Sequence, residues 1–236
     1  MINNKNVEKI AGMNHRNIHK SWLNGILPPL PESVKSILSD STKPFYPKPE
    51  HVFRSFEEPF NKTSLVIIGQ DPYINLCEGL NDTQVPQAVG LAFSIPKTCK
   101  KLPPSLKNIF KVAKINPLKR ENRGDISNWT KQGVLLLNAA LTVEPGKSNS
   151  HASAWSKWSD NLIKNMSTRS KKPLVFLLWG EFAKKKVKFL DKTKHRIITT
   201  SHPSHLSAYR GFLASNCFEK ANEVLKAIGQ EPILWS

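Results

Sequence analysis

Cysteine is scarce in this sequence, which limits the metal and redox chemistry that the chain can support. Only Cys77, Cys99 and Cys217 occur among 236 residues. Three thiols are too few for the four-thiolate set of an iron–sulfur cluster, and these three are too far apart in the sequence for a zinc knuckle or a redox pair. We therefore expect three free thiols in a reducing compartment, with no metal and no other cofactor.

Long apolar runs are also absent. No run approaches the roughly 20 residues that a membrane-spanning helix needs, and the polar start MINNKNVEKIAGMNHRN lacks the apolar centre of a secretory signal. No repeat or low-complexity block divides the chain. We expect a soluble, monomeric protein of the cytoplasm, or of the nucleus in a eukaryotic host. Its organisation should be a flexible segment at 1–20 followed by one domain at 21–236.

Acidic residues are few compared with basic ones. The chain has 18 Asp and Glu against 35 Lys and Arg, which gives a formal net charge of +17. A surface with this excess attracts polyanions, and lysines that neutralise phosphates gain affinity by releasing counterions. Any single lysine is more simply a solubilising side chain, so only the total excess indicates a nucleic-acid partner.

Short apolar runs alternate with segments of helical spacing. Four runs resemble strands buried on both faces: 65–69, 134–137, 174–179 and 197–200. Between and after them, apolar residues recur at helical spacing in 106–113, 155–163 and 218–228. Alternating strands and helices predict a three-layer α/β/α sandwich around a parallel sheet of four strands.

Residues that could bind a ligand or take part in catalysis follow these runs. Asp71 comes soon after the first run, Asn138 ends the second, Gly180 and Glu181 follow the third, and His202 follows the fourth. The carboxyl ends of strands in an open parallel sheet share one edge, and ligands bind there. We therefore expect an acid, an amide and an imidazole to meet in one crevice.

These three groups suit hydrolysis at a heterocycle. An Asp can orient or deprotonate a water, an Asn offers a donor and an acceptor to a planar edge, and a His can donate to an oxygen that gains charge. With Phe93 or Tyr73 as a stacking wall, the heterocycle could be a nucleobase taken out of its duplex. The same three residues would also serve an amidase or a phosphoesterase.

Five motifs resemble those of family 1 uracil-DNA glycosylases, and they occur in the order typical of that family. They are GQDPY (69–73), GLAFS (90–94), LPPSL (102–106), LLLNAALTV (135–143) and HPSHLSAYRGF (202–212). Flanking matches, FYPKPEHVFRSFEEPF (45–60) and EPILW (231–235), extend the similarity over most of the chain. Five ordered strings are far more specific than any one of them.

The resemblance implies a role for each residue of the reaction site. Asp71 would position the attacking water and stabilise an oxocarbenium-like sugar by its charge. Asn138 would read the Watson–Crick edge of uracil, and His202, acting neutral, would donate to the uracil oxygen that gains charge. Phe93 would stack on the flipped base, and Tyr73 would fill the space that a thymine methyl needs.

The resemblance also implies contacts with DNA. Leu206 would enter the duplex where the flipped nucleotide left, repaying part of the cost of unstacking. Ser105, Ser204 and Ser207 would bind phosphates, and Gln70 would contribute backbone contacts in the pocket. The implied partner is uracil-containing DNA, single- or double-stranded, and a DNA-mimic inhibitor protein could dock on the same surface.

The chain departs from the family pattern around the site. Ile74 and Val89 stand where the family usually has His, and the segment 75–85 is inserted between them. We hypothesise that this insertion is a mobile flap that alters access of DNA or water. Glu181 replaces a Ser that would meet phosphate, so repulsion is expected unless it turns away or nearby lysines compensate. His205 replaces a Pro before the wedge leucine.

Two alternatives remain beside a uracil-DNA glycosylase. One is a catalytically weak DNA-binding accessory protein of replication on the same fold, which loss of Asp71 or His202 would have signalled. The other is a glycosylase with altered base choice, which the changed loop after Tyr73 permits.

Overall fold

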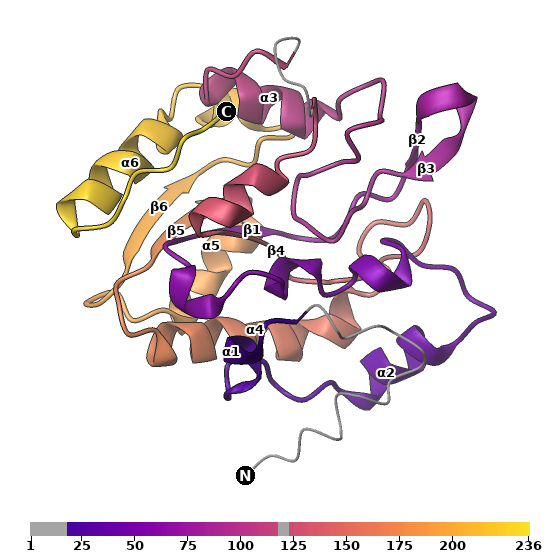
Figure 1. Cartoon of the computed structure of the whole chain (residues 1–236), viewed down its shortest axis with the longest axis horizontal. Coiled ribbons are helices and arrows are strands. Elements are labelled where there is room, and N and C mark those ends of the chain that lie inside the picture. The colour runs from indigo at the N-terminus through magenta and orange to yellow at the C-terminus, as the bar shows by residue number, and fades with distance from the viewer. Residues whose placement is uncertain (1–17, 118–122) are drawn as a thin grey trace.

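A parallel sheet of four strands organises the computed structural model, which describes residues 18–117 and 123–236 (Figure 1). The strands are β1 (Leu65–Gly69), β4 (Val134–Asn138), β5 (Val175–Trp179) and β6 (Arg196–Thr200). They lie in the order β4-β1-β5-β6, and every neighbouring pair is parallel. Each strand agrees with its predicted run to within one residue at either end, so the expected parallel sheet is confirmed.

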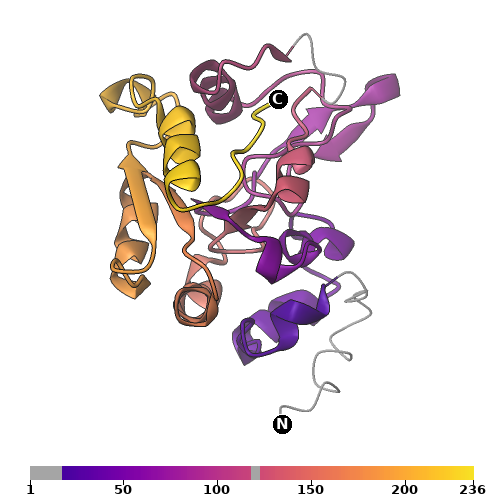
Figure 2. The same ribbon diagram turned by 60° about the vertical axis from the view of Figure 1, so that its left-hand side comes forward.

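Helices cover both faces of the sheet, which confirms the three-layer α/β/α sandwich. Figures 1 and 2 show two of the longer helices, α3 (Pro104–Val112) and α6 (Cys217–Ala227), on one side. The opposite side carries α1 (Lys20–Leu23), α2 (Glu32–Ser39) and α4 (Ala152–Arg169). A short helix, α5 (Gly180–Lys184), follows β5 directly.

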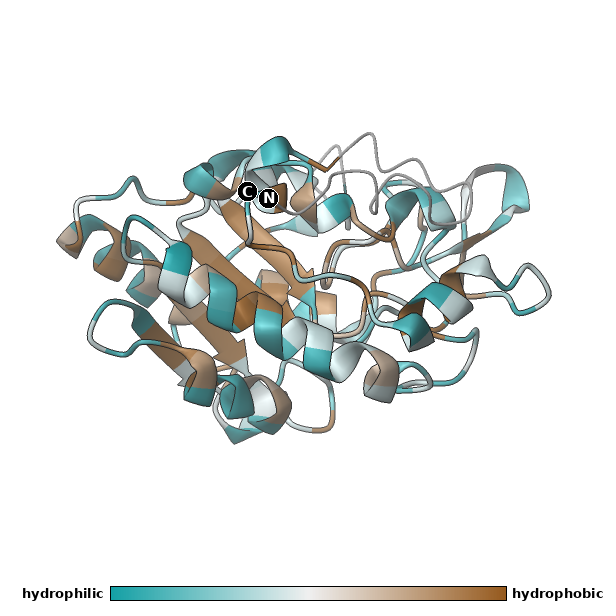
Figure 3. Cartoon of the chain, turned by 90° about the horizontal axis from the view of Figure 1, so that it is seen from below, coloured by the Kyte–Doolittle hydropathy of each residue, from teal (hydrophilic) through white to brown (hydrophobic). Residues whose placement is uncertain are grey.

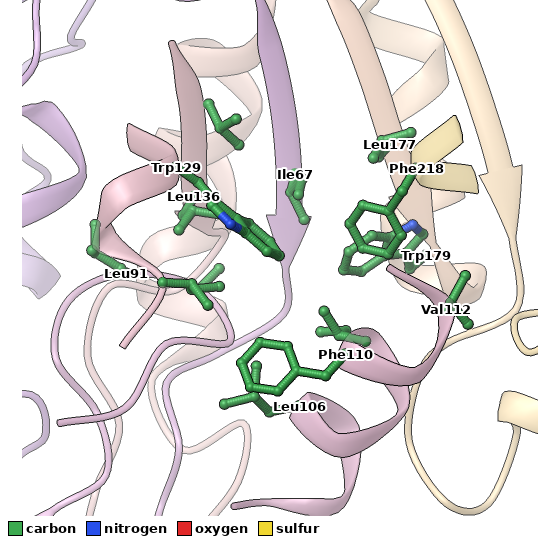
Figure 4. Packing of buried hydrophobic residues seen from close by; sticks show 14 of the residues in the cluster. Ile67, Leu91, Leu106, Phe110, Val112, Trp129, Leu136, Leu177, Trp179 and Phe218 are labelled. Carbon is green, nitrogen blue, oxygen red and sulfur yellow. The ribbon is translucent and has the colours of Figure 1, made fainter. Parts of the chain in front are cut away.

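Alternation along the strands divides the core into two clusters. Leu65 and Ile67 of β1 pack with the α3 and α6 side, where Phe110 and Phe218 are also buried (Figure 4). Val66 and Ile68 pack with the α4 side. Successive strand residues point to opposite faces, so strands covered on both faces must be apolar throughout. This explains why the runs in the sequence show no polar alternation.

The longest helix, α4, has the pattern expected for a helix that packs one face on a sheet. Trp155, Trp158, Leu162, Ile163 and Met166 are buried and recur at intervals of three and four residues. Figure 3 looks onto this side and shows hydrophobic strands behind a helix with hydrophilic turns. Burial of this apolar stripe holds the helix in place.

Short 3-10 helices occur in the connections. They are η3 (Pro49–His51), η4 (Arg54–Phe56), η5 (Phe60–Lys62), η6 (Leu80–Asp82), η8 (Ser127–Gln132), η9 (Lys185–Phe189) and η10 (Ala208–Arg210). Within 18–117 and 123–236, no helix is both long enough and apolar enough to cross a membrane. The proposed N-terminal segment, 1–20, lies outside the described residues except for its last three, of which Ile18 packs against the α4-side cluster.

The inserted segment 75–85 forms a second, antiparallel sheet. Its strands are β2 (Leu76–Glu78) and β3 (Gln84–Pro86), and they project from the body of the molecule (Figures 1 and 2). Lys100 fastens the hairpin by ion pairs to Glu78 at 2.6 Å and Asp82 at 2.8 Å. The segment hypothesised to be a flap is therefore a β-hairpin that is held by ion pairs to Lys100, a residue outside the hairpin.

A disulfide joins Cys77 of this hairpin to Cys99, with 5.6 Å between their Cα atoms. The expectation of three free thiols is wrong for these two, and only Cys217, which is buried, is free among them. Sequence separation was a poor guide because the hairpin returns β2 to the loop that carries Cys99. Residues 22 positions apart in the chain thus meet in space.

Candidate active site

A pocket of about 470 Å³ opens at the carboxyl edge of the sheet and brings the predicted site residues together. All of them but Ser207 line it: Gln70, Asp71, Tyr73, Phe93, Ser105, Asn138, His202, Ser204 and Leu206. They come from the end of β4, from the loops that follow β1 and β6, from the loop that carries Phe93, and from the first turn of α3. The predicted convergence of acid, amide and imidazole is therefore what the fold produces.

Two residues that the sequence did not indicate hold the Asp71 carboxylate. Its Oδ2 accepts hydrogen bonds from the Ser148 hydroxyl at 2.9 Å and from the Asn149 backbone N–H at 2.7 Å. Asn149 has a φ of 64°, a left-handed conformation that Asn tolerates better than most residues. These contacts hold the carboxylate through Oδ2, so Oδ1 is the oxygen that can serve a water or a substrate. The only signal in the sequence was the polar turn that follows LLLNAALTV.

The backbone determines which nitrogen of His202 carries the proton. Nδ1 accepts the backbone N–H of Ser204 at 3.1 Å, so Nδ1 is the unprotonated nitrogen and Nε2 is a donor. Burial lowers the pKa of His202, and the Asp71 carboxylate raises it by a smaller amount. The imidazole therefore stays neutral at neutral pH, with a single N–H to donate.

Gly180 permits the close approach of the His202 loop to α5. A Cβ at Gly180 would lie 2.8 Å from the His202 Cβ, and the φ of +84° also favours glycine. Glu181, the next residue, pairs with Lys184 at 2.8 Å, and Lys184 is the main reason that the pKa of Glu181 is lowered. The structure thus shows Glu181 paired with a lysine, while the expected repulsion of phosphate stays a prediction.

Asn138 is held against Gly69 on the neighbouring strand. The two residues are register partners of β4 and β1. A Cβ at Gly69 would lie only 2.3 Å from the Asn138 Oδ1. Asn138 is 7% exposed, so its amide is enclosed but reaches the pocket. The glycine thus makes room for the amide and limits how it can turn.

Aromatic rings form the wall of the pocket. The Phe93 ring lies 5.3 Å from Trp179 and 6.0 Å from His202, measured between centroids. Its φ of 65° is unusual for a bulky residue, and such strain is commonly found at functional sites. The Tyr73 hydroxyl donates to the Phe93 carbonyl at 3.3 Å, and burial raises the pKa of Tyr73. Ile74 and Val89 line the same pocket.

Hydroxyl groups and one exposed leucine form the rim. Ser204 and Ser207 share a hydrogen bond of 2.9 Å between their hydroxyls, and the Ser207 hydroxyl also donates to the His202 carbonyl at 3.0 Å. Leu206 is 68% exposed, which is unusual for leucine. Ser105 lies in the first turn of α3, and α3 is tied to this loop by Asn108, whose side chain donates to the Pro203 carbonyl at 2.8 Å.

Metal ligation is not a feature of this arrangement. Across the described parts of the chain, no three His, Cys, Asp or Glu side chains come together in a way that could hold an ion. The site instead presents one fixed carboxylate, one neutral imidazole and one oriented amide around an aromatic wall. That set can hold a flat heterocycle and a water.

Comparison with known proteins decides the family. A sequence model of the Uracil DNA glycosylase superfamily matches residues 57–226. The chain belongs to this superfamily. Among proteins named uracil-DNA glycosylase, one from Leuconostoc mesenteroides is 39% identical over 226 residues, 92% of this chain and 97% of that protein. One from Caenorhabditis elegans is 46% identical over 198 residues, 82% of this chain and 66% of that protein.

Solved structures of the superfamily share the fold. The crystal structure of mimivirus uracil-DNA glycosylase superposes with a TM-score of 0.82 at 30% identity, covering 92% of this chain and 86% of that one. A mimivirus UNG variant in complex with UGI gives the same TM-score at 31% identity, covering 92% and 88%. The family 1 resemblance of the motifs is consistent with both kinds of relative.

Proposed function

We propose that this protein excises uracil from DNA by flipping deoxyuridine out of the helix and hydrolysing its N-glycosidic bond, which leaves an abasic site. The observation that carries the proposal is the shared pocket of Asp71, Asn138 and His202, in which hydrogen bonds hold the carboxylate and the imidazole in place. Family membership supports the same activity. No observation favours an accessory protein without catalysis or an altered choice of base.

Asp71 acts on the sugar side of the reaction. As the bond between C1′ and N1 breaks, its electron pair leaves with uracil and positive charge develops on the sugar. A carboxylate held by Ser148 and Asn149 stabilises that charge without having to reorganise. Its free oxygen accepts a hydrogen bond from a water, which orients the water oxygen towards C1′.

His202 acts on the base side. Its Nε2–H donates to the uracil oxygen that gains negative charge as the base leaves. A neutral imidazole suits this task, because its Nδ1 is already occupied by the Ser204 N–H. Removal of one such donor typically costs roughly 10²–10³ in rate.

Residues in the enclosed part of the pocket recognise the base. Asn138 pairs with the Watson–Crick edge of uracil, and Phe93 stacks on its face. Tyr73, which is partly buried and hydrogen-bonded to the Phe93 carbonyl, occupies the place where a thymine methyl would fit. Gln70 contributes backbone contacts at the same end of the pocket.

The rim binds the DNA strand. Ser105, Ser204 and Ser207 contact phosphates around the flipped nucleotide, and Leu206 fills the space that the nucleotide vacates. The mimivirus UNG variant described above was solved in complex with UGI, an inhibitor protein. We propose that an inhibitor that mimics DNA docks on the same rim of this protein.

Asp71→Asn tests the proposal. A strand with a single deoxyuridine is incubated with the protein in the presence of chelator, and abasic sites are cleaved with alkali. The variant should excise at least roughly 10²-fold more slowly and still bind DNA, because the carboxylate contributes mainly in the transition state. Asp191→Asn removes an exposed carboxylate outside the pocket and is the matched control. Its excision rate should equal that of the wild type. Equal excision by wild type and Asp71→Asn would refute the mechanism.

A further inference from the structure

A second pocket, of about 330 Å³, lies at the edge of the sheet opposite the active site. It is lined by Ser21, Asn24, Ile26, Phe60, Asn61 and residues 169–172. Residues 60–61 lead into the start of β1, and 169–172 lead into the start of β5, whereas the active-site residues follow the ends of these strands. Figures 1 and 2 show α1 and α4, each of which contributes one lining residue, on the same side of the sheet. A ligand here would not compete with a flipped base.

The charged groups of this pocket are all cationic. Arg169, Lys171 and Lys172 line it, and no carboxylate does. The Lys172 ammonium donates to the Ser64 hydroxyl at 3.0 Å and to the Lys62 carbonyl at 3.4 Å, beside the pocket. Burial lowers the pKa of Lys172. A pocket whose charged lining groups are three cations favours an anionic ligand.

The Arg169 guanidinium lies against Gly25. A Cβ at Gly25 would lie 3.0 Å from Cζ of Arg169 and 3.1 Å from each terminal nitrogen, so the guanidinium packs against the glycine. The φ of +79° at Gly25 also favours glycine. A guanidinium packed in this way loses less freedom when it binds a planar or tetrahedral oxyanion.

Amides and apolar side chains complete the pocket. Asn24 and Asn61 bring side-chain N–H donors, while Ile26 and Phe60 contribute buried apolar surface. Arginine, lysine and amide donors are the groups that bind phosphate oxygens, and the apolar surface suits an attached organic group. The volume is within the range of small-ligand sites.

We propose that this pocket binds a phosphate monoester. Arg169, Lys171 and Lys172 would surround the phosphate, and Ile26 and Phe60 would contact the organic group attached to it. A free nucleotide and the terminal phosphate of a DNA strand share this chemistry. The position at the opposite edge allows the monoester and uracil-containing DNA to be bound at the same time.

Backbone amide shifts in two-dimensional NMR spectra test the proposal. The titrants are adenosine 5′-monophosphate, a short oligonucleotide with a 5′-phosphate, and the same oligonucleotide with a 5′-hydroxyl. The proposal expects saturable shifts at Asn24, Asn61 and Lys171 with the nucleotide and none with the 5′-hydroxyl oligonucleotide. Shifts with the nucleotide alone would identify a small-molecule site, and shifts with both the nucleotide and the 5′-phosphate oligonucleotide would identify a strand-end site as well. Shifts confined to active-site residues would overturn the proposal.

A pair of double variants provides the control. Arg169→Gln with Lys171→Gln should weaken nucleotide binding at least about tenfold, since one hydrogen bond to a charged group is worth roughly that factor. Lys157→Gln with Lys164→Gln removes the same charge from exposed positions of α4 outside the pocket and should change binding less than about twofold. Uracil excision should be the same in both. Equal nucleotide affinity of the two double variants would also overturn the proposal.

Discussion

The Asp71 carboxylate accepts a hydrogen bond from the Asn149 backbone N–H across 78 positions of the chain, at 2.7 Å. The Ser148 hydroxyl donates to the same oxygen at 2.9 Å. The orientation of the proposed catalytic carboxylate thus depends on a turn after β4, rather than on its own loop. Ile74, where the family usually has His, offers no polar side chain for this purpose.

Ser148→Ala should therefore slow excision by about tenfold, because one hydrogen bond to a charged group is lost. The affinity for uracil-containing DNA should stay the same, since Ser148 acts through Asp71. Single-turnover rates and equilibrium binding measure the two effects separately. Ser148→Thr keeps the hydroxyl and should restore most of the rate; a Thr variant as slow as the Ala variant would argue against the positioning role.

The excision rate should depend on pH through His202. Burial lowers the pKa of this imidazole below its ordinary value of about 6.5. The neutral form, which is the proposed donor, therefore persists at pH 6.5, and the rate should fall only at more acidic pH. The pH profile of single-turnover excision checks the prediction, and the ¹⁵N shifts of His202 should show protonated Nε2 with unprotonated Nδ1. A rate that falls already at pH 7 and above would contradict it.

Much of the site could be predicted because it depends on residues that end strands. The apolar runs located four strands, and parallel strands bring their carboxyl ends to one edge. The sequence therefore predicts that Asp71, Asn138 and His202 lie close together. The five ordered motifs added Phe93 and the rim serines.

The rest could not be predicted because it depends on how loops fold back. The contact of Ser148 and Asn149 with Asp71 is made by a turn with a left-handed residue, and no periodicity reports such a turn. The Cys77–Cys99 disulfide likewise depends on the hairpin of β2 and β3. Loop geometry of this kind has no signature in spacing or composition.

Reduction of that disulfide should destabilise the protein. A crosslink that closes a loop of 22 residues stabilises the folded state by about 3 kcal/mol, mainly by restricting the unfolded chain. Denaturant unfolding with and without reductant measures the difference in the free energy of unfolding. The Cys77→Ser variant should match the reduced wild type, and reductant should have no further effect on it. An unchanged stability after complete reduction would contradict the prediction.

Stability should also fall in mild acid through the buried His195. Its Nδ1 accepts the Leu174 N–H at 3.0 Å and its Nε2 donates to the Ser167 carbonyl at 2.9 Å, so the folded protein holds it neutral. Burial lowers its pKa. Above about pH 6.5 both folded and unfolded states are neutral. As the pH falls below this value the unfolded state takes up a proton first, so the free energy of unfolding decreases until the folded pKa is reached.

The slope from this one group is at most about 1.4 kcal/mol per pH unit. Denaturant unfolding between pH 7 and 5 measures the slope, and His195→Gln should reduce it. His205→Gln changes an exposed histidine and is the matched control. Identical slopes in wild type and His195→Gln would show that other groups cause the acid sensitivity.

Gly69→Ala should damage base recognition through Asn138. The added methyl would lie 2.3 Å from the Asn138 Oδ1, so the amide must turn away from the orientation in which it faces the pocket. Misplacing a recognition group by a fraction of an ångström to an ångström can cost up to roughly 10²-fold in rate, and we expect a loss of at least tenfold in excision. A double-mutant cycle separates this route from general damage. In an Asn138→Ala background the methyl has no amide to displace, so Gly69→Ala should cause little further loss. Full additivity of the two losses would show that the glycine acts through something other than Asn138.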